Sequence, residues 1–374
     1  MKLKTNRTET PASLHIEKRT LSGWISKNRV LVIIIIVAMI LMGGGTAAYF
    51  LLLNKNPEPA PVATTPDPEP PVEPEPDPVY YSELTGKVVE TEEDRYAAVT
   101  AIMIENSPDA RPQSGLKNSG VVFEAIAEGG ITRFLVLYQS EKPKMIGPVR
   151  SVRMYYVDWL TPFQASVAHV GGSHEALKLV RNGTYRDIDE FFNTDTYWRA
   201  TDRWAPHNVY TSFSRIDALN KKKKYTKSEF TGFPRKDEEE VAEASVKTIN
   251  VTISSSLYNS SYKYNAKNNS WDRSQADAAH RDREDGRISP EVVIVMSVEE
   301  KLVQEDGWRE QITTIGSGKA YIFQDGKVVE GKWQKTSRKK QLEFLDKNGK
   351  SIELNRGQTW ITAIPNHGGS VKWK

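Results

Sequence analysis

The sequence predicts an α+β protein in which an N-terminal transmembrane helix and a disordered proline-rich stalk precede a mixed α/β domain and a β-rich domain. Three observations lead to this prediction. Residues 30–53 are uncharged and mostly apolar, residues 54–79 hold ten prolines in 26 positions, and strand patterns replace helix patterns after residue 246. The length of 374 residues suits two ordinary domains.

Charge is distributed unevenly, although 51 Lys and Arg nearly balance 48 Asp and Glu. Residues 1–29 carry seven basic against two acidic side chains, a net charge of +5, whereas residues 54–79 carry a net charge of −5. The near balance excludes a strongly basic nucleic-acid-binding chain. Cysteine is absent, which excludes disulfides, thiol nucleophiles and cysteine-ligated metal sites. We expect no nucleic-acid partner, and no residue pattern in the sequence points to a cofactor or a metal.

The uncharged run at residues 30–53 predicts a single membrane span. As a helix its 24 residues extend about 36 Å, enough for a hydrocarbon core of about 30 Å. The basic segment before it predicts that residues 1–29 stay in the cytoplasm and that the rest is extracytoplasmic. A cleavable signal peptide ending near Thr46-Ala47-Ala48 is the alternative, but the apolar residues continue through Leu53.

Residues 54–79 alternate proline with acidic side chains and offer almost nothing to pack. As an extended polyproline II segment they would reach roughly 80 Å, which predicts a spacer between membrane and body. A ligand for SH3-type domains is the alternative, which the acidic residues between the prolines disfavour.

The first folded region is expected over residues 84–237 and mixes strand with helix patterns. Its expected elements are a buried strand at 99–104, a hairpin of 121–127 and 131–138, a helix over 151–160 with Ser151 as N-cap, a strand at 165–170 and a helix at 174–181.

The second region, residues 246–374, is expected to consist almost entirely of strands, and to meet the first region near residues 235–248 as a separate domain. Its clearest expected elements are an apolar strand at 292–298, a hairpin of 319–324 and 327–333 around Asp325-Gly326, and a hairpin of 342–345 and 352–354.

Familiar catalytic motifs fail on spacing. His174-Glu175 begins like a zinc-protease helix, but Lys178 stands where the second histidine belongs. The stretch from Gly171 to Glu175 resembles a nucleophile elbow around Ser173, but Glu175 replaces the closing glycine.

Five polar segments remain, at residues 111–116 (RPQSGL), 124–133 (EAIAEGGITR), 147–153 (GPVRSVR), 169–176 (HVGGSHEA) and 203–211 (RWAPHNVYT). Their order resembles the N-terminal domain of the DUF3048 (YerB-like) family of bacterial envelope proteins. Residues 246–365, with LNRGQTWI at 354–361 and Pro365, resemble the C-terminal domain of that family. The resemblance implies a fold and an extracytoplasmic location, but no reaction. Members are typically lipoproteins, whereas this chain has no cysteine to lipidate.

Charged residues in these segments predict one cleft for an anion. Arg150 and Arg153 flank Ser151 at an expected helix start, where unpaired N–H groups favour negative charge. Glycines 171 and 172 allow a ligand to approach the backbone, and a histidine can transfer protons near neutral pH. The candidate ligand-binding residues are Arg133, Arg150, Arg153, Gly171, Gly172, Ser173 and Arg203, and the catalytic candidates are His169, His207 and Glu124.

The same residues permit a purely structural interpretation, in which Arg150–Glu124 and Arg153–Glu128 are ion pairs that tie a helix to a sheet. Three functions therefore stay open: binding of an anionic wall polymer or envelope partner, a hydrolase or transferase acting on a phosphorylated or acidic glycan, and a structural interaction module. Whether the protein is an enzyme is left open. Trp333 and Trp360 could stack on sugars, although packing in a β-domain core is the favoured interpretation.

Overall fold

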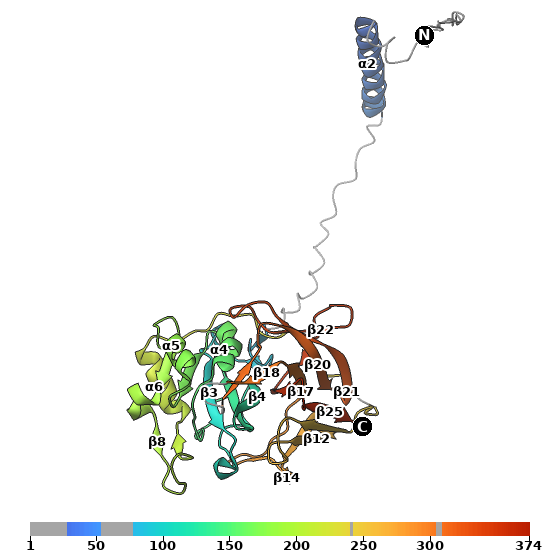
Figure 1. Ribbon diagram of the computed structural model, residues 1–374. Coiled ribbons are helices and arrows are strands. Elements are labelled where there is room, and N and C mark those ends of the chain that lie inside the picture. Colours follow the sequence, from blue (N-terminus) through green and yellow to red (C-terminus); the bar gives the residue numbers. More distant parts are fainter. Residues whose placement is uncertain (1–27, 54–77, 240–241, 304–308) are drawn as a thin grey trace, which may run out of the picture. The chain divides into compact units, whose positions relative to one another are not determined.

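A computed structural model describes residues 28–53, 78–239, 242–303 and 309–374 (Figure 1). The chain divides into two compact units, Met1–Glu75 and Pro76–Lys374. Most of the expected cytoplasmic tail and nearly all of the expected stalk lie outside the described residues.

Helix α2 (Arg29–Leu53) coincides with the expected membrane span, and its side chains are described as far as Met42. Among the described residues, no helix combines the length and the apolar character needed to cross a membrane. This finding does not support the expected span, which stays a prediction.

The second unit is built on a ten-stranded mixed sheet. In spatial order its strands are β22 (Glu343–Asp346), β21 (Lys327–Lys335), β20 (Gly316–Gln324), β17 (Val292–Val298), β24 (Thr359–Pro365), β4 (Val121–Glu128), β5 (Ile131–Tyr138), β3 (Thr100–Glu105), β6 (Ser166–His169) and β7 (Arg186–Asp189). Neighbours are parallel at β17–β24, β24–β4, β3–β6 and β6–β7, and antiparallel elsewhere.

One sheet therefore runs through both expected domains. We had expected two separate domains that meet near residues 235–248, and the continuous sheet contradicts their separation. Strand β24 comes from the second region and pairs with β4 of the first, with Thr359 opposite Val121 and Thr362 opposite Glu124. Strand β5 pairs with only one edge of β4. Pairing with β24 satisfies the backbone groups of the other edge, which would otherwise be left open.

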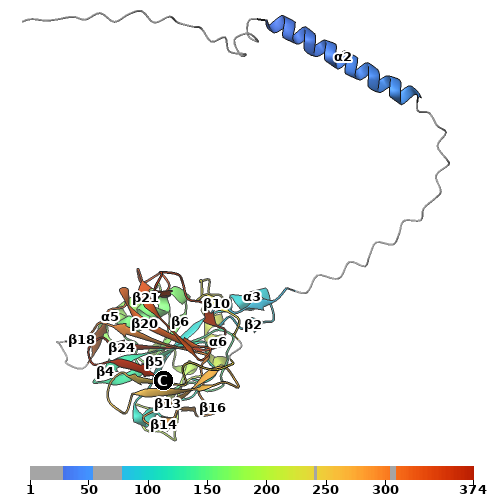
Figure 2. The ribbon, with the colours of Figure 1, turned by 90° about the vertical axis from the view of Figure 1, so that its right-hand side faces the viewer.

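A second sheet of five strands covers part of one face of the large sheet. Its order is β14 (Ala278–Ala279), β13 (Ser270–Gln275), β12 (Ser260–Asn265), β11 (Thr248–Thr252) and β25 (Ser370–Trp373). Side chains such as Trp271 and Tyr262 of this sheet pack in one buried cluster with Val122 and Val293 of the large sheet. The two sheets lie face to face, as Figure 2 shows for β13 and β4.

The helices of this unit are α3 (Glu92–Arg95), α4 (Met154–Leu160), α5 (His174–Val180) and α6 (Phe213–Lys222), with 3₁₀ turns η1 (Pro108–Ala110), η2 (Thr161–Phe163), η3 (Glu190–Phe192) and η4 (Thr194–Thr196). Trp159 of α4 stacks on Phe123 of β4 with ring centroids 5.3 Å apart. Residues of α4 and α5 share one buried cluster with alternate β4 side chains, whereas α6 belongs to the cluster on the opposite face. The large sheet is thus covered on both faces.

Helix α4 begins later than expected, and its N-cap is Arg153 instead of Ser151. The preceding residues have an extended backbone instead, because Val149 forms a β-bridge with Ile104 and Val152 forms one with Gly172. Ser151 lies between these two bridges and cannot adopt a cap position.

Five short strand pairs complete the unit: β1 (Tyr80–Tyr81) with β2 (Val88–Val89), β8 (Trp198–Arg199) with β9 (Val209–Tyr210), β10 (Arg235–Lys236) with β23 (Leu354–Asn355), β15 (Arg281–Asp282) with β16 (Gly286–Arg287), and β18 (Glu300–Leu302) with β19 (Glu310–Ile312). The expected hairpin of 342–345 and 352–354 is only partly formed, because Leu354 pairs with β10. The described part is an α+β protein that is mostly β after residue 246, as expected.

Candidate functional site

Three adjacent parallel strands of the large sheet end in ionisable side chains. Strand β3 ends at Glu105, β6 at His169 and β7 at Asp189. The carboxyl ends of parallel strands are the usual position of ligand sites in α/β sheets. All three side chains are almost fully buried, so the fold assembles polar groups beneath this edge of the sheet.

Glu105 joins two of the predicted site residues. Its Oε1 accepts hydrogen bonds from His207 Nδ1 at 2.9 Å and from Ser107 Oγ at 3.0 Å, and its Oε2 lies 3.3 Å from Arg150 Nε. The structure therefore brings the two candidates Arg150 and His207 to the same carboxylate, that of Glu105, which was not among the predicted site residues. His207 Nε2 points to the other side, 3.9 Å from Asp109 Oδ2.

A cleft of about 750 Å³ opens beside His207. Its lining consists of Asp109, Arg111, Pro112, Asp202, Arg203, Trp204, Ala205, His207 and Arg283. Two predicted site residues, Arg203 and His207, belong to it. Sequence reasoning missed Arg111 and Trp204, although both lie inside segments that it had singled out.

The guanidinium groups of Arg203 and Arg111 donate mainly to backbone oxygens. Arg203 donates to Asp109 O at 2.8 Å and to Pro112 O at 2.6 Å. Arg111 donates to Asn106 O at 2.9 Å and to Leu257 O at 2.8 Å. Neither arginine forms an ion pair with any carboxylate of the described residues. Both positive charges are therefore available to a ligand in this cleft, which we call the arginine cleft.

Burial lowers the pKa of Arg111, because its charged form loses hydration. Arg283 differs from the other two arginines, since it pairs with Asp202 across the arginine cleft and this hydrogen bond raises its pKa. Arg283 lies between β15 and β16, so both halves of the chain contribute to the arginine cleft.

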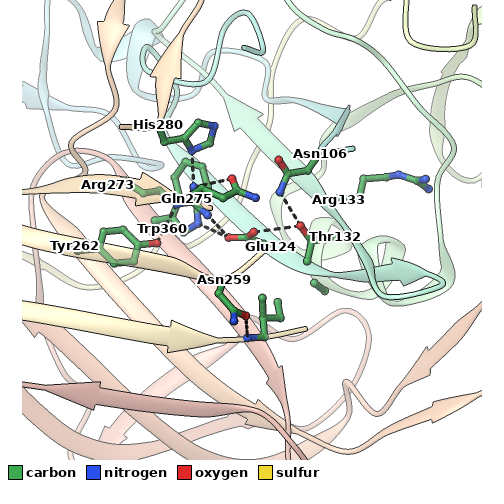
Figure 3. A network of polar contacts seen from close by, with 12 residues as sticks. Asn106, Glu124, Thr132, Arg133, Asn259, Tyr262, Arg273, Gln275, His280 and Trp360 are labelled. Carbon is green, nitrogen blue, oxygen red and sulfur yellow. Dashed lines mark hydrogen bonds and ion pairs between the residues drawn. The ribbon is translucent and has the colours of Figure 1, made fainter. Parts of the chain in front are cut away.

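Glu124, a catalytic candidate, is completely buried in a polar network (Figure 3). Its Oε2 accepts hydrogen bonds from Arg273 at 2.8 Å and from Trp360 Nε1 at 3.1 Å, and its Oε1 accepts one from Thr132 Oγ1 at 3.2 Å. The expected Arg150–Glu124 pair is not formed. Sequence analysis missed Arg273, because it lies 149 residues from Glu124 and carries no local motif.

The same network continues from Arg273 to His280 (Figure 3). Burial, together with the Arg273 charge, holds the pKa of His280 well below its ordinary value, so His280 is neutral. Its Nδ1 accepts a hydrogen bond from Arg273, and its Nε2 donates to Gln113 Oε1 at 3.1 Å. Gln113 and Arg111 both donate to Asn106 Oδ1, at 2.9 and 3.2 Å.

Glu128 lies on the opposite face of the large sheet from Glu124. Strand alternation predicts that the two share a face, but a β-bulge shifts the register between Ile126 and Glu128. Glu128 pairs with Arg133 and with Arg153. The Arg153–Glu128 pair is the one that the structural interpretation predicted. Burial alone would raise the pKa of Glu128, but the two arginines lower it to about 2.

A second cleft, of about 660 Å³, is lined by Arg153 and Ser173 together with residues of β18 and β19. The predicted site residues are therefore divided between two clefts and buried networks, and neither cleft contains them all. The functional roles assigned to them stay predictions.

His169 is fully buried and has oxygen partners on both ring nitrogens. Nδ1 lies 2.7 Å from Gly171 O, and Nε2 lies 2.9 Å from Asp187 Oδ1. Atoms of His169, Asp187 and Asp189 lie within 4.8 Å of one another, which is the spacing of a metal-binding group. Asp189, however, already pairs with Arg181, so a metal would have to compete with that positive charge.

Trp333 and Trp360 are both buried, so the core-packing interpretation is confirmed for them. The indole N–H of Trp333 donates to Ser297 O at 2.7 Å. These two side chains cannot stack on a sugar.

Comparison with known families identifies the class of protein. Residues 84–226 match the family "Protein of unknown function (DUF3048) N-terminal domain", and residues 248–361 match the DUF3048 C-terminal domain. The chain therefore belongs to the DUF3048 family, which confirms the resemblance seen in the five segments.

A relative and a solved structure agree with this assignment. The chain is 32% identical over 288 residues to the "Putative lipoprotein YerB" of Bacillus subtilis (strain 168), covering 75% of this chain and 85% of that protein. It also matches the crystal structure of the YerB protein from Bacillus subtilis with a TM-score of 0.70 at 28% identity, covering 78% of this chain and 99% of that one.

Replacing Glu124 with Gln tests the buried network. The Glu124→Gln variant keeps the shape of the side chain but leaves the Arg273 charge buried without a partner. We expect the free energy of unfolding in urea to fall by about 3–5 kcal/mol. The exposed Glu343→Gln control should change it by less than about 0.5 kcal/mol. Equal stabilities of the two variants would show that Glu124 does not neutralise Arg273.

The pH dependence of stability tests Glu300. Burial, and then the charge of Glu310, raise the pKa of Glu300 from 4.5 to about 8. The folded state therefore holds a proton that the unfolded state releases, so stability should decrease as pH rises from about 5 to about 9. Urea unfolding of Glu300→Gln should lose this part of the pH dependence, whereas Glu299→Gln should retain it. Parallel pH profiles for the wild type and Glu300→Gln would contradict the prediction.

Proposed function

We propose that residues 30–53 anchor this protein in the cell membrane, with the N-terminus in the cytoplasm and residues 54–374 outside. Two observations support the proposal: the span is uncharged and follows a segment of net charge +5, and α2 covers the same residues. The relative's name describes a lipoprotein. Because this chain has no cysteine to lipidate, a protein helix would take over the anchoring role here.

Protease treatment of intact cells tests this topology. We expect an external protease to remove the folded body and to leave a short membrane-bound fragment that contains residues 1–53. A cytoplasmic protein should stay intact in the same samples. Full protection of the body until the cells are lysed would contradict the proposal.

We propose further that the body binds an anionic ligand of the cell envelope in the arginine cleft. The observation that carries this proposal is that Arg111 and Arg203 line the cleft without an ion-pair partner among the described residues. Charge-assisted hydrogen bonds to phosphate or carboxylate are stronger than neutral ones, and each contributes about 1.5–3 kcal/mol. The position beyond the carboxyl end of β3 agrees with the usual place of ligand sites in such sheets.

Binding to a purified polyol-phosphate wall polymer tests the anion site. We expect Arg203→Gln to weaken binding roughly ten- to a hundredfold, and to do so most at low salt, where surface charges are least screened. Arg95→Gln is the matched control, since Arg95 pairs with Glu83 outside the arginine cleft. Circular dichroism melts of each variant separate lost binding from lost folding. Equal affinity of wild type and Arg203→Gln would contradict the proposal.

A second function, a hydrolase or transferase on a phosphorylated or acidic glycan, is favoured by the His207–Glu105 contact. A carboxylate on Nδ1 orients the imidazole and leaves Nε2 towards the cleft, as general acid–base catalysis requires. Ser107 is not the nucleophile of a triad here, because its hydroxyl lies 3.2 Å from Nδ1, the same nitrogen that Glu105 occupies. Release of low-mass products by wild type but not by His207→Gln would distinguish this function from binding alone.

A further inference from the structure

Trp204 is the most exposed aromatic side chain that the described residues place in the arginine cleft. The residue is 89% exposed. No aromatic or cationic side chain of the described residues packs against its ring. Tryptophan is highly buried on average in folded proteins, whereas this indole lies in water among the arginines that line the cleft.

The backbone that carries Trp204 is held in place although its side chain is not. Trp204 O accepts a hydrogen bond from His207 N at 2.9 Å. Arg203, the preceding residue, is attached to the opposite wall of the arginine cleft through Asp109 O and Pro112 O. The indole therefore stands on a fixed support, and binding a ligand against it costs little loop entropy.

The rest of the lining shows which chemistry fits this indole. Trp204 is the only large apolar side chain that lines the arginine cleft in the described residues, and Pro112 and Ala205 are small. Protein interfaces bury clusters of large apolar anchors, which this cleft does not offer. A sugar ring instead has one apolar face of C–H groups and a rim of hydroxyls, and one aromatic surface is enough to stack on it.

The carboxylates of the arginine cleft support the same conclusion. The side chain of Asp109 is 82% exposed, and that of Asp202 is half exposed. Carboxylate oxygens accept hydrogen bonds, and sugar hydroxyls can donate them, whereas phosphate or carboxylate groups alone cannot. A ligand that carries both hydroxyls and anionic groups satisfies both kinds of side chain.

We propose that the ligand of the arginine cleft is a glycosylated anionic polymer, in which a sugar ring stacks on Trp204 while a neighbouring phosphate or carboxylate contacts Arg203 and Arg111. This inference rests on the anion-binding function proposed above and specifies its ligand. Trp204 supplies selectivity for the sugar, and the arginines supply affinity for the charge.

The test compares one polyol-phosphate wall polymer before and after enzymatic removal of its sugars, by isothermal titration with the full-length protein. We expect wild type to bind the glycosylated form more tightly, and Trp204→Ala to lose roughly three- to tenfold in affinity for that form alone. Trp204→Phe should restore part of the preference, because it keeps an aromatic face. Phe192→Ala, which removes another exposed aromatic side chain (69% exposed) outside the arginine cleft, should change nothing.

The outcomes separate the two proposals. If wild type binds both polymers equally and Trp204→Ala has no effect, the sugar inference is overturned while the anion site stands. If wild type binds neither polymer, the anion-binding function itself fails. If Trp204→Ala loses affinity for both forms to the same extent, Trp204 does not contribute to selective binding of the sugar, and the inference is again overturned.

Discussion

The ion pair between Glu124 and Arg273 is the constraint on which the rest of the body depends. Glu124 comes from the centre of the large sheet and Arg273 from the five-stranded sheet, and both are completely buried. A buried charge is tolerated only with a well-placed partner and satisfied hydrogen bonds. Thr132, Trp360 and Tyr262 provide these bonds to the pair. The two sheets must therefore meet in one register, because any shift would leave both buried charges without a partner.

This constraint reaches the arginine cleft through a continuous series of contacts. His280 and Gln113 connect Arg273 to Asn106, and Asn106 receives a hydrogen bond from Arg111. Arg111 is thus oriented from the core, although its guanidinium lines an open cleft. The anion site proposed for this cleft requires buried and rigid supporting contacts of this kind.

Several parts of the body follow from local sequence pattern. The apolar runs predicted β3, β4, β5 and β17 nearly to the residue, because strands buried on both faces require such runs. The Asp325-Gly326 pair also predicted the turn between β20 and β21. In the structure both residues have positive φ, as this type of tight turn requires. The pairing of Arg153 with Glu128 was foreseen as well, whereas the bulge that moves Glu128 to the other face was not.

The sequence by itself determined which residues carry charge and where strands and turns occur, because these depend on side-chain type and on short-range backbone preferences. Only the tertiary structure decided their partners: Glu124 with Arg273, Arg150 with Glu105, and β24 beside β4. Contacts between residues far apart in the sequence leave no periodic trace in the chain, so neither the single continuous sheet nor the composition of the arginine cleft could be read from local pattern. Trp204 shows the same limit, since its exposure depends on which segments surround it and not on its neighbours in the sequence.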